Sequence, residues 1–168
     1  MMALTELIEA LSESIGRAVS WLTLGMVLAL VVVVVLRYGF GIGAVALQEA
    51  ALYMHALVFL LGAAYTLRHG EHVRVDVFYR DWPVRRRAAV DLAGALLLLI
   101  PVCALIFWSS LDYVAAAWRV REGSREAGGL PWLYLLKTVI PVAAVLLALQ
   151  GCVQAWRAWR TLRERTEA

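Results

Sequence analysis

Residues 18–36 read AVSWLTLGMVLALVVVVVL and contain no charged side chain. Three more uncharged runs follow along the chain, at residues 50–67, 92–111 and 138–156. The hydrocarbon core of a bilayer is roughly 30 Å thick, and a helix of about 20 residues crosses it. Each of the four runs therefore has the length of one transmembrane helix.

The composition favours a membrane protein over a soluble one. Hydrophobic residues make up 62% of the 168, and the mean hydropathy is +0.74. A soluble domain of this size could not bury so much apolar surface. Every backbone amide in lipid needs a partner within the protein, which leaves helices or a closed barrel. The apolar runs are continuous instead of alternating, so they indicate helices.

These observations predict an all-α integral membrane protein with one domain over residues 1–168. We expect four transmembrane helices, at about 15–37, 48–68, 86–112 and 131–156. Residues 44–46 read AVA, which has the small-x-small form of a signal-peptide cleavage site. The preceding apolar run is longer than the core of a typical signal peptide, so we expect the first helix to be retained.

The placement of arginine predicts the orientation. With a cytoplasmic N-terminus, eleven arginines lie in the inner segments and four in the outer ones. The positive-inside rule then places both termini and the loop between the second and third helices in the cytoplasm. The basic clusters lie directly beside the apolar runs, so we expect no nucleic-acid partner. Tryptophans gather near both predicted interfaces, as aromatic belts do.

Two further segments are predicted to lie at the inner membrane surface. Residues 3–17 carry apolar residues at three- and four-residue spacing, which is typical of an amphipathic helix on that surface or of an extension of the first span. Valines alternate with charged residues from residue 73, so we expect an interfacial segment over about 72–84. Four residues in or directly after it are expected to contact phospholipid headgroups: Trp82, Arg85, Arg86 and Arg87.

Charged residues within or beside a span are costly and need a partner or a role. Lys137 lies six residues after Pro131, which is about 9 Å along a helix that rises 1.5 Å per residue. Arg37, Glu49 and Asp112 also border the outer ends of spans. We favour an ion-paired cluster that fixes the helices to each other or to a second subunit. The alternative is that Lys137 snorkels outward and Glu49 only caps its helix.

No residue pattern indicates catalysis. His55 lies inside the second span, and the other two histidines lie beyond the inner end of the same helix. Ligation of haem or a metal from facing helices is therefore not expected. The chain also shows no nucleophile–base pair and no phosphate-binding glycine loop. We expect no enzyme activity, no metal and no cofactor.

Several short motifs resemble one family in their order and spacing. They read VVLRY at 34–38, QE at 48–49, FLLGAA at 59–64 and RHGEHVRVD at 68–76, with GLPW at 129–132 and IPV at 140–142. Over roughly residues 18–156 the chain resembles the DctQ-type small permease subunit of tripartite ATP-independent periplasmic (TRAP) transporters. One departure is that the family often has two acidic residues where this chain has Gln48 and Glu49.

The resemblance implies a function and partners. The chain would be a static scaffold subunit in the bacterial inner membrane, beside a large permease subunit and a periplasmic substrate-binding protein. In that family the large subunit carries the substrate and sodium sites and moves as an elevator. The system would take up an organic acid, coupled to sodium. Membrane phospholipids are the remaining expected partner.

The expected sites follow from the charges and the resemblance together. Polar residues expected to serve subunit contacts or the structure are Arg37, Gln48, Glu49, Arg68, His72, Arg74, Asp76, Asp112 and Lys137. Contact with the binding protein is expected from Arg119, Arg121 and Arg125 in the outer segment. Two rival functions are an autonomous small proton-coupled multidrug antiporter that uses Glu49 and a redox membrane anchor of the cytochrome b kind.

Overall fold

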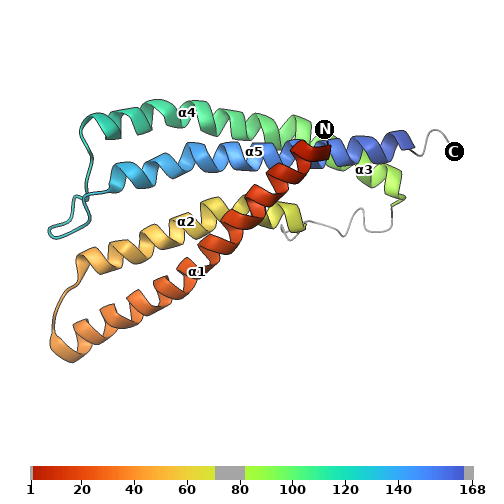
Figure 1. The fold of residues 1–168 in the computed structure, drawn as a ribbon. Helices are drawn as coiled ribbons and strands as arrows, with labels where there is room; N and C mark the ends of the chain where they lie inside the picture. The colour runs from red at the N-terminus through yellow and green to blue at the C-terminus, as the bar shows by residue number, and fades with distance from the viewer. Residues whose placement is uncertain (1, 71–81, 165–168) are drawn as a thin grey trace.

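The computed structural model describes residues 2–70 and 82–164 (Figure 1). Its helices are α1 (Met2–Phe40), α2 (Val45–His69), α3 (Val84–Gly94), η2 (Ala95–Leu99), α4 (Ile100–Arg119) and α5 (Leu133–Glu164). The segments α3, η2 and α4 follow one another without a break, so the described residues form four long helical rods. Each rod is long and apolar enough to cross a bilayer. The prediction of an all-α protein with four transmembrane helices is confirmed.

The rods extend beyond the predicted spans at most of their ends. α1 begins at Met2 and runs without interruption through residues 3–17. Of the two alternatives for that segment, the structure therefore shows an extension of the first span. Most of the predicted interfacial segment at 72–84 lies outside the described residues, so its place at the membrane surface stays a prediction. The orientation of the termini across the membrane also stays a prediction.

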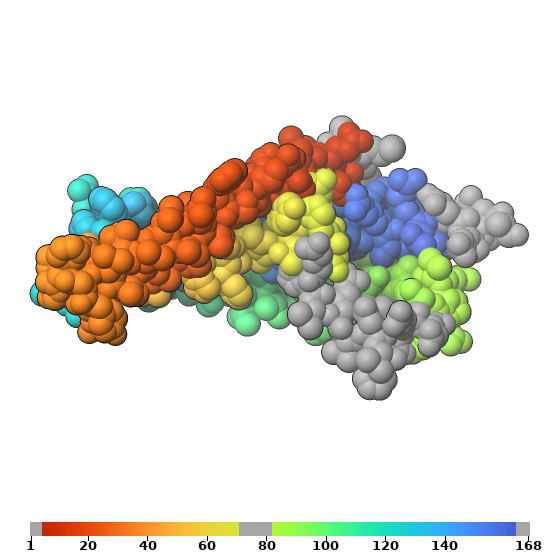
Figure 2. Space-filling view, turned by 90° about the horizontal axis from the view of Figure 1, so that it is seen from below, coloured from red at the N-terminus to blue at the C-terminus, as the bar shows by residue number. Residues whose placement is uncertain are grey.

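The rods lie in a row instead of around a common centre (Figure 1). α2 and α5 pack against each other in the middle, α1 packs on α2, and the continuous rod of α3, η2 and α4 packs on α5. Within the described ranges α1 reaches α5, while it does not contact α3 or α4. The flanking helices consequently expose long apolar faces, including Trp21 of α1 and Trp108 of α4. Figure 2 shows how much of α1 lies open on one side of the molecule.

Glycines allow close helix contacts at two places in this row. A Cβ atom added to Gly16 of α1 would collide with the ring of Tyr65 on α2. A Cβ atom on Gly151 of α5 would lie 2.7 Å from Leu99 Cδ2 of η2. Small residues at such contacts let membrane helices approach closely, because van der Waals packing supplies much of the attraction in lipid.

The rod from Val84 to Arg119 contains one irregular turn. Pro101 has no backbone N–H, and in a regular helix its ring would clash with the carbonyl group of Leu97. Residues Ala95–Leu99 adopt the wider π-helical geometry immediately before this proline. The wider turn accommodates the proline without breaking the rod, so α3 and α4 act as one membrane helix.

Candidate functional site

The segment between α4 and α5 folds over the first turns of α2 and is held there by Glu49. The hydroxyl group of Ser124 donates to Glu49 Oε1, and the Leu130 N–H donates to Glu49 Oε2 at 2.6 Å. A backbone hydrogen bond of 2.8 Å from the Ser124 N–H to the Leu130 carbonyl closes the segment. A Cβ atom on Gly129 would lie 2.5 Å from Ser124 Cβ and 2.8 Å from Glu49 Oε1, so a larger residue here would displace the two side chains that form this contact. One carboxylate therefore ties α2 to the connection between α4 and α5.

Lys137 forms a second contact at the same end of the molecule. Its Nζ donates to Glu122 Oε2 at 2.5 Å and lies 4.0 Å from the centroid of the Tyr113 ring. Lys137 is only 9% exposed. A cation over an aromatic ring is attracted by the ring's electrons, and an ion pair shielded from water is screened less than one on the surface. The ammonium group thus joins α5 to α4 and to the segment that follows it.

Within the described residues the four charges expected to form a cluster do not make one ion-paired group, and their contact with a second subunit stays a prediction. Glu49 and Lys137 each bind a partner from residues 120–132, and they do not pair with each other. Arg37 and Asp112 are both exposed and form no ion pair with a described residue. The distance of a charged residue from the end of its apolar run predicts its depth in the membrane. Which charges pair depends instead on the side of the helix that each one occupies. Lys137 is buried and its Nζ binds Glu122, just after the end of α4.

Acidic residues of α1 form the corresponding contacts at the opposite end of the molecule. Arg68 Nη1 of α2 donates to Glu13 Oε2 at 2.6 Å and to the Glu9 carbonyl oxygen at 2.9 Å. The Glu9 carboxylate pairs with Arg157 of α5. Arg17 Nε lies 3.2 Å from Glu13 Oε1, one turn along the same helix. α1 is therefore tied to both central helices by ion pairs.

The sequence interpretation missed this network, although it singled out Arg68. The signal was the four-residue spacing of Glu9, Glu13 and Arg17, which places all three on one face of a helix. Arginines directly after two of the uncharged runs supply the partners.

Two glutamines join the helices within the apolar region. Gln150 of α5 is fully buried, and Ser12 Oγ of α1 donates to its Oε1 at 3.2 Å. One turn later, Gln154 Nε2 donates at 2.7 Å to the carbonyl oxygen of Leu67, near the end of α2. Polar side chains hold membrane helices together because lipid offers them no alternative partner.

The comparisons with known proteins agree with the motif resemblance. The model of the family described as tripartite ATP-independent periplasmic transporters, DctQ component, matches residues 26–161. The chain belongs to the DctQ family. No curated protein and no solved structure matches in the other two comparisons. The chain is thus identified as the small membrane subunit of a TRAP transporter.

The other residues predicted for this DctQ subunit lie as follows. Gln48 is half-buried, and its backbone N–H bonds to the Ala44 carbonyl in the first turn of α2. Arg87 Nε donates to the Trp82 carbonyl oxygen at 2.9 Å. The remaining predicted residues within the described ranges are exposed, namely Trp82, Arg85, Arg86, Arg119, Arg121 and Arg125. His72, Arg74 and Asp76 lie outside the described residues.

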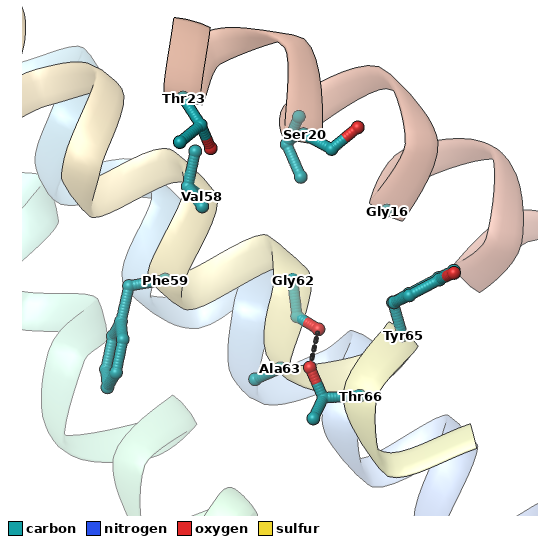
Figure 3. A pocket seen from close by; sticks show the side chains of 10 residues that line it. Gly16, Ser20, Thr23, Val58, Phe59, Gly62, Ala63, Tyr65 and Thr66 are labelled. Atoms are coloured by element: carbon teal, nitrogen blue, oxygen red, sulfur yellow. Dashed lines mark hydrogen bonds between the residues drawn. The ribbon is translucent and has the colours of Figure 1, made fainter. Parts of the chain in front are cut away.

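A groove of about 520 Å³ runs between α1 and α2 of this DctQ chain (Figure 3). Small residues line it, with Gly16 on one helix and Gly62 on the other. Two of its hydroxyl groups bond within their own helices: Thr66 Oγ1 donates to the Gly62 carbonyl at 3.0 Å, and Ser20 Oγ donates to the Arg17 carbonyl at 2.8 Å. The groove therefore offers shape and no reactive group. Within the described residues no cluster of side chains suits a metal ion.

Proposed function

We propose that this DctQ subunit is a static scaffold that braces the large permease subunit of its TRAP transporter in the membrane. The large subunit would carry the substrate and sodium sites, and a periplasmic binding protein would deliver an organic acid. The subunit itself would bind no cofactor and would lie in the bacterial inner membrane.

The observation that carries this proposal is the use of charged side chains at both ends of the row. Glu49 and Lys137 join the helices at one end, and Glu9 and Glu13 join them at the other. A transport path needs polar groups that a moving solute can reach in the middle of the membrane. Here the ion pairs instead cross-link neighbouring helices near their ends, which suits a rigid body.

An exposed polar residue on α2 supports a protein partner in the membrane. His55 is exposed although it lies within the uncharged run at 50–67. The neighbouring Leu52 and Phe59 are 64% and 72% exposed. An imidazole that faces lipid is costly, and a helix of the large subunit packed on α2 would cover it.

Assembly with the large subunit tests the proposal. A tagged copy of this chain, expressed together with the large subunit, should retain that subunit through detergent extraction and purification. Cells that lack this chain should show uptake at background level, because the large subunit would have lost its support. Recovery of the chain alone, together with unchanged uptake in its absence, would rule out a bracing role.

The contacts of Glu49 give less support to the alternative hypothesis of an antiporter. A proton-exchanging carboxylate must meet water and then the cargo. Both oxygens of Glu49 instead accept hydrogen bonds from the segment between α4 and α5. Drug resistance conferred by this gene alone would support the antiporter hypothesis.

The exposed arginines at the outer end are proposed to contact the binding protein. Replacing Arg119, Arg121 and Arg125 by Glu should lower binding-protein-dependent uptake at limiting binding protein by roughly tenfold, since charge reversal weakens electrostatic association. Assembly with the large subunit should not change. Arg163→Glu, at the other end of the molecule, is the control. Uptake that is equal in the triple variant and in the control would dismiss this contact.

A further inference from the structure

A cavity of about 460 Å³ lies between the ends of α2, α3 and α5, at the end of the molecule that holds both termini. Each of these helices contributes one arginine to its lining: Arg68 from α2, Arg87 from α3 and Arg157 from α5. The cavity separates α2 from α3, which pack on α5 and do not contact each other within the described ranges.

The three arginines lie at the same depth relative to the apolar runs. Arg68 directly follows the run at 50–67, and Arg157 directly follows the run at 138–156. Arg87 lies just over one helical turn before the run at 92–111. The hydrocarbon core is expected to end where such runs end, so we expect all three guanidinium groups at the level of the lipid phosphates.

Residues of α1 bind two of these arginines, and these contacts leave some of the guanidinium N–H donors unused. Arg68 bonds to Glu13 and to the Glu9 backbone, and Arg157 pairs with the Glu9 carboxylate. A guanidinium group has five N–H donors in a fixed plane, so each retains donors beyond these contacts. Among the described residues Asp91 is the carboxylate that lines the cavity, while Glu13 and Glu9 bind Arg68 and Arg157 from outside it.

We propose that this cavity binds the phosphate group of a membrane phospholipid, whose headgroup would bridge α2 and α3. Guanidinium groups bind phosphate oxygens with paired hydrogen bonds, and basic pockets between membrane helices are known to hold lipid headgroups. Asp91 would accept hydrogen bonds from an amine or hydroxyl group farther along the headgroup. Arg87, one of the residues expected to contact headgroups, lines this cavity, whereas Arg85 and Arg86 do not. The site does not depend on the bracing role.

Native mass spectrometry of the purified chain after detergent washing tests this site. We expect the wild type to retain one phospholipid per chain, and Arg87→Gln to retain roughly fivefold less. Arg163→Gln is the control, because Arg163 is an exposed residue of α5 outside the cavity, and it should retain lipid as the wild type does. Arg87→Lys should retain an intermediate amount.

Inorganic phosphate, added at millimolar concentration, tests whether the cavity binds a phospholipid headgroup or free phosphate. A lipid site should keep its phospholipid, since acyl chains add apolar contacts that free phosphate lacks. The proposal is overturned if the washed wild type holds no phospholipid, if free phosphate displaces it, or if Arg163→Gln and Arg87→Gln lose lipid equally.

Discussion

Replacing Lys137 by Met should lower the melting temperature of the detergent-purified chain by about 5 °C or more. The substitution removes the ammonium group that binds Glu122 and lies over the Tyr113 ring, and it leaves the Glu122 carboxylate without that partner. Removing one member of a shielded ion pair costs more than removing both, because the remaining charge stays desolvated. Co-purification of the large subunit should fall along with stability.

The double variant Lys137→Met with Glu122→Gln is the control for this effect. It removes the orphaned carboxylate, so it should recover much of the lost melting temperature. Equal loss in the single and the double variant would show that the ion pair contributes nothing. A single variant with unchanged melting temperature and unchanged assembly would remove Lys137 from the account.

Replacing Glu49 by Ala should release the segment between α4 and α5 from α2. The Leu130 N–H and the Ser124 hydroxyl group would lose their carboxylate acceptor. Amide hydrogen exchange in a peptide that covers residues 120–132 should become about tenfold faster, because a hydrogen bond to a charged group is among the stronger ones. Exchange in the middle of α5 should not change.

Gln48→Ala is the matched control for Glu49→Ala. Gln48 is the preceding residue of the same helix, and its backbone N–H bonds to Ala44 within the helix start. Its replacement should leave exchange in the outer segment as it is in the wild type. Slow exchange at Leu130 in Glu49→Ala would mean that the carboxylate does not hold this segment.

The helices could be predicted from the sequence, and their arrangement could not. Four uncharged runs of one bilayer thickness predict four helices directly. A soluble helix shows its packing side by an apolar stripe, but residues 18–36 are apolar all round. Nothing in that run indicates that α1 packs on α2 while the rod of α3, η2 and α4 packs on α5.

For the candidate sites, the sequence predicted the depth of the charged residues in the membrane and did not predict their partners. Glu49 and Lys137 were expected to need partners, and both have them. Their partners come from residues 120–132, an irregular segment whose path depends on glycines such as Gly129 and on the carboxylate itself. The pairs of Glu9 and Glu13 with arginines of α2 and α5 depend on contacts far apart in sequence.

We expect the chain to support transport without carrying solute itself. Purified chain should be reconstituted into vesicles alone, and in parallel with the large subunit, the binding protein and a sodium gradient. We expect no solute movement by the chain alone and organic acid uptake by the complete set. Solute accumulation driven by the chain without its companions would contradict this expectation.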